Sequence, residues 1–151
     1  MARIDFAFGA PDRLRTACQV ARKQYLAGQP LVVYCADPVR LTAFDRMLWA
    51  FDDISFVPHV LATDPLASET PVVLTAADPA AMAAPATAER PAPWLLNLDD
   101  DCPPNYQAFP RILEIVSADG DDRPAARQRW RVYQAQGESP HSHAIGGKAA
   151  N

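Results

Sequence analysis

A chain of 151 residues, of which 49% are hydrophobic and 21% charged, has the size and composition of one globular domain. No run approaches the roughly 18 apolar residues of a membrane span, and the first nine residues lack a secretion signal, so we expect a cytoplasmic protein without membrane contact. The net charge of -4 disfavours strong direct binding to nucleic acid unless the basic residues gather on one face.

Short apolar runs alternate with amphipathic stretches along the chain. Strands are predicted at residues 4–8, 31–35, 54–57, 72–75, 94–98 and 111–116. Helices are predicted from Pro11 to Gly28, from Asp37 to Phe51 and from about Asp122 to Gln136. This alternation predicts the α/β class, with three layers, a mostly parallel central sheet and helices on both faces, in a Rossmann-like topology.

The domain is expected to comprise residues 1–137. Residues 138–151, ESPHSHAIGGKAAN, contain too few apolar side chains to order themselves, and we expect a flexible tail. Residues 78–93 are rich in alanine and proline, which predicts a weak helix followed by a loop, or a surface excursion.

The cysteines and histidines carry no metal or disulfide pattern. Cys18, Cys35 and Cys102 are widely spaced and odd in number, so we interpret them as buried thiols. His59 follows Pro58 and is interpreted as a structural histidine. His141 and His143 lie in the expected tail, where nothing would orient an H-x-H pair toward a metal.

Two features test the hypothesis of an enzyme. The stretch FAFGAPD after the first strand lacks both glycine-rich phosphate motifs, so no nucleotide site is predicted. Asp99, Asp100 and Asp101 follow a predicted strand, where Asp99 or Asp101 could hold Mg²⁺ in a phosphoryl-transfer enzyme. A solvated turn is the favoured interpretation. Because no nucleophile and base occur together, we expect no catalytic activity.

Trp49 and Phe56 flank the end of the second predicted helix. On that helix Leu41, Phe44, Leu48 and Phe51 form the inner stripe, whereas Trp49 falls roughly 80° away from Leu41. Trp49 either packs sideways under the following loop or forms an apolar patch with Phe56. Aromatic residues of this kind are enriched at protein interfaces.

Basic residues gather on the last predicted helix, in DDRPAARQRWRVYQAQG. Arg123, Arg127, Arg131 and Trp130 share roughly 100° of helix face, while Tyr133 continues the buried side. This face is either merely solvated or a receptor for an acidic peptide, in which arginines pair with carboxylates beside an aromatic slot. Single-stranded DNA is a rival ligand for arginines beside an aromatic ring.

At these stretches the sequence resembles the chi subunit of bacterial DNA polymerase III, an accessory protein of the clamp loader. The matching stretches are LVVYCAD, FDRMLWAFDDISFVPHVLA, PWLLNLDDDCPP, ILEIV and RQRWRVYQAQG. The resemblance extends from Arg3 to Gly137. Its most distinctive parts are L-W-A followed by S-F-V-P-H, and R-x-R-W-x-x-Y-x-x-x-G.

The resemblance implies a non-enzymatic adaptor in DNA replication, with an α/β fold and no cofactor. Chi-like proteins bind the psi subunit of the clamp loader on one side. A separate surface takes the acidic, aromatic C-terminal peptide of the single-stranded-DNA-binding protein. The resemblance assigns Trp49 and Phe56 to the psi surface, which a helicase also uses in some bacteria. It assigns the following residues to the peptide site: Arg123, Arg127, Trp130, Arg131 and Val116.

Overall fold

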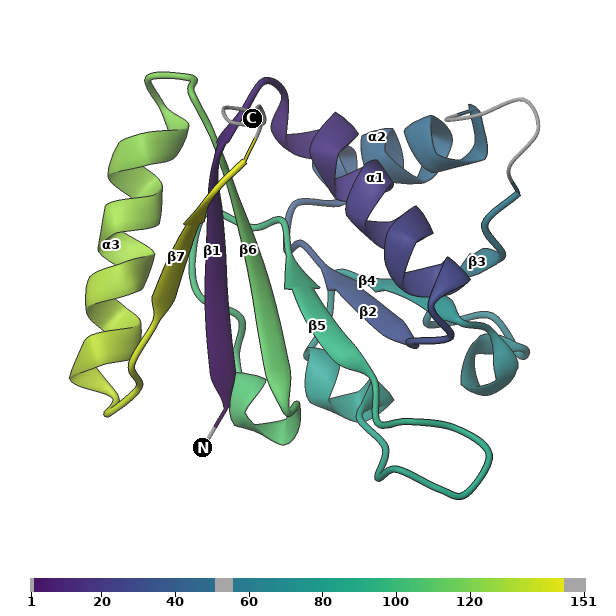
Figure 1. Ribbon diagram of the computed structural model, residues 1–151. Helices are drawn as coiled ribbons and strands as arrows, with labels where there is room; N and C mark the ends of the chain where they lie inside the picture. Colours follow the sequence, from purple (N-terminus) through teal and green to yellow (C-terminus); the bar gives the residue numbers. More distant parts are fainter. Residues whose placement is uncertain (1, 51–55, 146–151) are drawn as a thin grey trace.

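The computed structural model describes residues 2–50 and 56–145 of the chain. Its centre is a seven-stranded sheet in the order β3-β4-β2-β5-β6-β1-β7, in which every neighbouring pair runs parallel (Figure 1). The strands are β1 (Arg3–Ala10), β2 (Leu31–Tyr34), β3 (His59–Leu61), β4 (Val72–Thr75), β5 (Trp94–Asn97), β6 (Arg111–Ser117) and β7 (His141–Ala144). The predicted α/β class with a parallel sheet is confirmed.

Three α-helices cover the two faces of this sheet. They are α1 (Arg13–Leu26), α2 (Pro38–Ala50) and α3 (Asp122–Ala135). Helices α1 and α2 lie on one face and α3 on the other, which gives the predicted three layers (Figure 1). Short 3-10 helices lie in the connections: η1 (Ala67–Glu69), η2 (Pro79–Met82) and η3 (Tyr106–Ala108). The predicted weak helix within residues 78–93 corresponds to η2, and irregular chain follows it.

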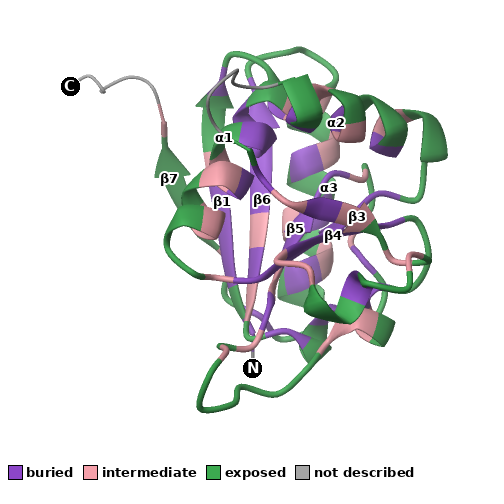
Figure 2. Ribbon diagram, turned by 90° about the vertical axis from the view of Figure 1, so that its right-hand side faces the viewer, coloured by how far each residue is buried: buried purple, intermediate pink, exposed green. Residues whose placement is uncertain are grey.

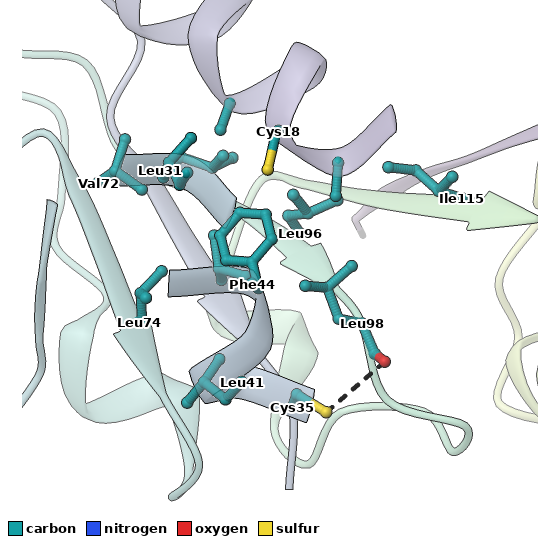
Figure 3. Packing of buried hydrophobic residues seen from close by; sticks show 14 of the residues in the cluster. Cys18, Leu31, Cys35, Leu41, Phe44, Val72, Leu74, Leu96, Leu98 and Ile115 are labelled. Carbon is teal, nitrogen blue, oxygen red and sulfur yellow. Dashed lines mark hydrogen bonds between the residues drawn. The ribbon is translucent and has the colours of Figure 1, made fainter. Parts of the chain in front are cut away.

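Each face of the sheet carries its own apolar cluster, because successive side chains of a strand point to opposite faces. In β2, Val33 belongs to the cluster that contains residues of α1 and α2, whereas Val32 belongs to the cluster on the opposite face, which contains residues of α3. Phe44 of α2 is completely buried and lies among the strand residues of the first cluster (Figure 3). The predicted inner stripe of α2 is confirmed at Leu41, Phe44 and Leu48, and Phe51 lies outside the described residues.

The cysteines are free thiols in the structure. Cys18 and Cys35 are buried as predicted, whereas Cys102 is only half-buried, because it lies in the irregular segment after β5. Burial raises the pKa of Cys18 and of Cys102 to about 12, so both thiols remain protonated at neutral pH.

One predicted strand is displaced along the chain. The prediction placed this strand at residues 54–57. Residues 54 and 55 lie outside the described residues, and Val57 is buried but does not belong to a strand. The strand in this region is β3, which begins at His59 and pairs with β4. The shift has a physical reason, because Pro58 has no backbone N–H to contribute to a ladder.

The largest departure from the sequence expectation is β7. Residues 138–151 were expected to form a flexible tail, but 141–144 pair with β1 as the outermost strand of the sheet. Gly137, at φ 89°, ends α3 and turns the chain back, and the N–H of Glu138 donates to the carbonyl of Tyr133. All four residues of β7 are exposed (Figure 2). The strand thus gains its place from backbone pairing, which composition does not reveal.

Side chains on the α1 face also hold β7 in place. Asp5 of β1 is buried and accepts hydrogen bonds from Arg3 at 3.0 Å and Arg111 at 2.7 Å. Its other oxygen lies 2.9 Å from Nε2 of His143, which corrects the expectation that nothing would orient this histidine. Gly9 permits a close approach nearby, because a Cβ there would lie 3.2 Å from the carbonyl oxygen of Ile145.

The Asp5 cluster predicts a specific loss of stability in acid. Burial by itself raises the pKa of Asp5, but the hydrogen bonds from His143, Arg3 and Arg111 outweigh it and hold the pKa at about 2, below the ordinary 3.8. A lowered pKa adds stability above the unfolded-state value, and this stability is lost as the pH falls toward the folded-state value. We therefore expect the free energy of unfolding at pH 6 to be about 2 kcal/mol lower for Asp5→Asn than for the wild type.

Urea denaturation between pH 6 and pH 2 measures this difference, which should shrink as the pH falls from about 4 to 2. The exposed carboxylate variant Glu89→Gln serves as the control and should track the wild type throughout. A difference that stays constant over the whole range would show that Asp5 acts by shape and not by charge.

Candidate functional site

A buried ion pair anchors α3 to the sheet. Arg129 on the inner side of α3 is 2% exposed, and its Nε donates to Oε1 of Glu114 in β6 at 3.0 Å. The other oxygen of Glu114 accepts from the Tyr133 hydroxyl at 2.7 Å and from the Asn97 amide at 2.8 Å. Burial, and next the charge of Glu114, raise the pKa of Tyr133, so its hydroxyl keeps the donated proton. Both oxygens of the buried carboxylate are thus satisfied.

The three consecutive aspartates form a turn that arginines hold from several sides. Arg40 donates to the carbonyl oxygen of residue 98 at 2.8 Å. Arg13 donates to that of residue 99 at 2.9 Å, and Arg129 to that of residue 100 at 3.1 Å. The Asp100 carboxylate also pairs with Arg40, and this hydrogen bond chiefly lowers its pKa. Within residues 2–50 and 56–145, no three His, Cys, Asp or Glu side chains gather as a metal site. The turn is therefore a junction between α3, α1 and α2.

The opposite side of α3 borders a groove, here called the arginine groove. Arg123, Arg127 and Arg131 lie at four-residue spacing and are exposed. The groove has a volume of about 550 Å³ and lies between α3 and the edge of the sheet formed by β1 and β7. Figure 1 shows these elements on one side of the molecule. Its lining consists of Phe6, Phe8, Val116, Arg123, Ala126, Arg127, Trp130, Arg131, Gln134 and Ser142. All five residues predicted for a peptide site therefore come together around one groove.

The groove combines an aromatic floor with a cationic rim. The Trp130 ring packs on Phe6 at a centroid distance of 5.0 Å, and Phe8 is 42% exposed. In the part of the chain that the structure describes, no carboxylate lies at ion-pair distance from any of the three rim arginines, Arg123, Arg127 and Arg131. These guanidinium groups are thus available to an external anion.

Sequence reasoning missed the groove residues that come from the sheet edge. Phe6 and Phe8 alternate in RIDFAFGA, and this period of two would have placed both on one face of a strand. Ser142 had no such signal, because it belongs to the unpredicted strand β7. Gln134 continues the exposed row of α3 one turn beyond Trp130.

A second surface lies near the opposite edge of the sheet, here called the aromatic patch, formed by Trp49 and Phe56. The two rings lie 5.2 Å apart and are 51% and 62% exposed, so the patch expected from the helix spacing is present. Trp49 also packs on the buried His59 at 4.2 Å.

His59 fixes the position of Trp49 by its own contacts. Its Nδ1 lies 2.8 Å from the carbonyl oxygen of Val57. Its Nε2 lies 2.9 Å from Oδ1 of Asp45, a close polar contact without the alignment of a hydrogen bond. His59 is thus a structural histidine, as predicted, and it supports the patch from beneath.

Comparison with known proteins assigns the family. The sequence profile of the family described as "DNA polymerase III chi subunit, HolC" matches residues 1–141. The chain belongs to this chi-subunit family. The DNA polymerase III subunit chi of Pseudomonas aeruginosa is 30% identical over 149 residues, which cover 96% of this chain and 98% of the relative.

More distant chi relatives follow the same pattern. Those of Haemophilus influenzae and Escherichia coli are 24% and 25% identical, over 86% and 80% of this chain and 85% and 77% of their own lengths. The resemblance found in the sequence is thereby confirmed, and with it a place among the accessory subunits of DNA polymerase III in replication. No described helix of this chi-family chain is long and apolar enough to cross a membrane.

Because Arg129 anchors α3, replacing an arginine on the inner side of this helix should destabilise the fold far more than replacing one on its outer side. Arg129→Ala leaves the Glu114 carboxylate buried without its cation, and we expect a loss of about 3 to 5 kcal/mol in the free energy of unfolding. Arg127→Ala on the outer side of the same helix should change it by less than about 0.5 kcal/mol. Urea denaturation measures both variants. Equal costs would mean that Arg129 does not anchor the helix.

Proposed function

We propose that this chi-family chain is a non-catalytic adaptor that links the clamp loader to single-stranded-DNA-binding protein. In this proposal the arginine groove binds the acidic, aromatic C-terminal peptide of that protein. The observation that carries it is the row of three arginines free of ion pairs in the described chain, beside an aromatic floor. The activity belongs to the bacterial cytoplasm, where the chromosome is replicated.

The groove offers separate chemistry for the two parts of such a peptide. Arg127 lies between Arg123 and Arg131 and is the expected partner of the terminal carboxylate or of an acidic side chain. Planar guanidinium groups bind carboxylates through paired hydrogen bonds, which adds geometric selectivity to charge attraction. Trp130 and Val116 supply an apolar surface for the aromatic ring.

Weak single contacts are sufficient for this role. The rim arginines are exposed, and exposed ion pairs contribute little each and weaken with salt. A strand of coated DNA presents many identical tails, so the effective concentration of peptide near one groove is high. The adaptor can therefore hold the clamp loader near the DNA without binding DNA itself.

We assign the aromatic patch to the psi subunit, or in some bacteria to a helicase on the same surface. Two large rings at 51% and 62% exposure have the chemistry of interface anchors. The patch belongs to the β3 side of the sheet and the arginine groove to the β7 side (Figure 1). Two partners can thus occupy the chain together without touching each other.

Arg127→Ala should lower the affinity for the acidic C-terminal peptide about tenfold, because one charge-assisted contact is lost. Isothermal titration calorimetry measures the affinity, and circular dichroism checks the fold. The matched control is Arg46→Ala, which removes an exposed arginine of α2 and should leave the affinity unchanged. Unaltered peptide binding by a folded Arg127→Ala variant would remove the peptide from this groove. Tight binding of a bare oligonucleotide would instead favour direct recognition of DNA.

Trp49→Ala should weaken the complex with psi by about thirtyfold and leave peptide binding intact, because a central aromatic anchor contributes about 2 kcal/mol or more. The complex can be followed by size-exclusion chromatography and calorimetry. Leu26→Ala is the control, since Leu26 is an apolar residue of α1 that is 66% exposed. A joint loss of both binding activities and of thermal stability would identify Trp49 as a core residue.

A further inference from the structure

The outer edge of β7 borders the arginine groove and pairs with no strand within residues 2–50 and 56–145. β7 is the last strand in the sheet order, and it pairs only with β1 among the described strands. The N–H of Ile145 donates to the carbonyl of Phe8 at 2.9 Å, so that peptide group faces β1. Because backbone groups of successive residues face opposite sides of a strand, Ser142 and Ala144 direct theirs away from β1.

This edge lies beside the same groove that carries the cationic rim. Ser142 lines the groove together with Arg131 and Gln134 of α3, so β7 and α3 form its two walls. An open strand edge presents unpaired donors and acceptors that an extended chain can satisfy. Figure 2 shows β7 exposed at the margin of the sheet.

The spacing of the two walls fits an extended acidic peptide. Arginines four residues apart on a helix are separated by about 6 Å along its axis. Side chains on one face of a strand are separated by about 6.7 Å, since they recur at every second residue. A chain paired with β7 would therefore present alternate side chains in near register with Arg123, Arg127 and Arg131. Charge complementarity selects acidic side chains for those positions.

We propose that the acidic peptide binds as an added strand on the outer edge of β7. The backbone of Ser142 and Ala144 pairs with the peptide backbone, and the peptide's alternate side chains reach the arginine row of α3. The sheet gains an eighth strand in the complex. This inference rests on the proposed function of the arginine groove and adds the backbone contact that selects an extended ligand.

Backbone methylation of the ligand tests this strand pairing directly. The probe is a synthetic peptide of the cognate protein's acidic C-terminal tail, together with a series in which one backbone nitrogen at a time is methylated. Pairing with an edge predicts an alternating pattern, in which every second methylation lowers the affinity about three- to tenfold and the intervening ones do much less. Fluorescence anisotropy measures each affinity with the full chain.

A protein variant supplies the second arm. Proline is tolerated at an edge position whose N–H faces outward, so Ser142→Pro should keep the fold while it removes one donor to the peptide. Its loss of affinity should clearly exceed that of Ser142→Ala, which keeps the N–H.

The outcomes separate the two proposals. Alternation in the methylated series supports strand addition even if Ser142→Pro fails to fold. If the methylated series shows no alternation while Arg127→Ala still lowers the affinity for the unmethylated peptide, strand addition is overturned. The groove then remains the peptide site. No effect of Arg127→Ala on the parent peptide refutes the groove site, and strand addition with it.

Discussion

The buried pair of Glu114 and Arg129 is the interaction on which the arrangement of α3 depends. A lone charge in this interior would be very costly, and the pair is tolerated because Tyr133, Asn97 and the carbonyl of Asp100 complete its hydrogen bonds. These contacts fix the rotation of α3 about its axis. Arg127 and Arg131 lie two positions before and after Arg129. They are therefore on nearly the opposite side of the helix, so they face outward when Arg129 faces inward. One helix therefore uses arginine in two ways.

The parallel sheet keeps the arginine groove apart from the aromatic patch. The arginine groove is lined by residues of α3, β1, β6 and β7, whereas the aromatic patch depends on α2 and the chain entering β3. Three largely buried strands, β4, β2 and β5, lie between β3 and the strands that line the groove. A rigid body with two remote surfaces suits the proposed adaptor role, in which each partner would bind without rearranging the other site.

Much of the fold could be predicted because apolar periodicity is strong where strands and helices are buried. LVVY and VVLT read as buried strands, and the stripe of Leu41, Phe44 and Leu48 fixed the inner side of α2. β7 could not be predicted in this way, because HSHA buries no side chain and is held by backbone pairing and by the contact of His143 with Asp5. The boundary expected at residue 137 was wrong for this reason.

The site was predictable only on its helical side. Four residues of α3 share one face by spacing alone, whereas Val116 entered through the family resemblance and Phe6, Phe8 and Ser142 were missed. The helix pattern is local, but the pairing that brings β1 and β7 beneath it joins residues more than 130 positions apart. Which strands become neighbours depends on the topology of the whole sheet, so the residue pattern of one segment cannot predict it.

The central claim is that an acidic, aromatic-ended peptide binds between α3 and the β7 edge. The most direct measurement is a nuclear magnetic resonance titration of the isotope-labelled chain with that peptide, following every backbone amide. The account predicts that the large shifts fall on α3 from Arg123 to Gln134, on Phe6 and Phe8, and on Ser142 and Ala144. Shifts centred on Trp49 and Phe56, or on no surface at all, would contradict it.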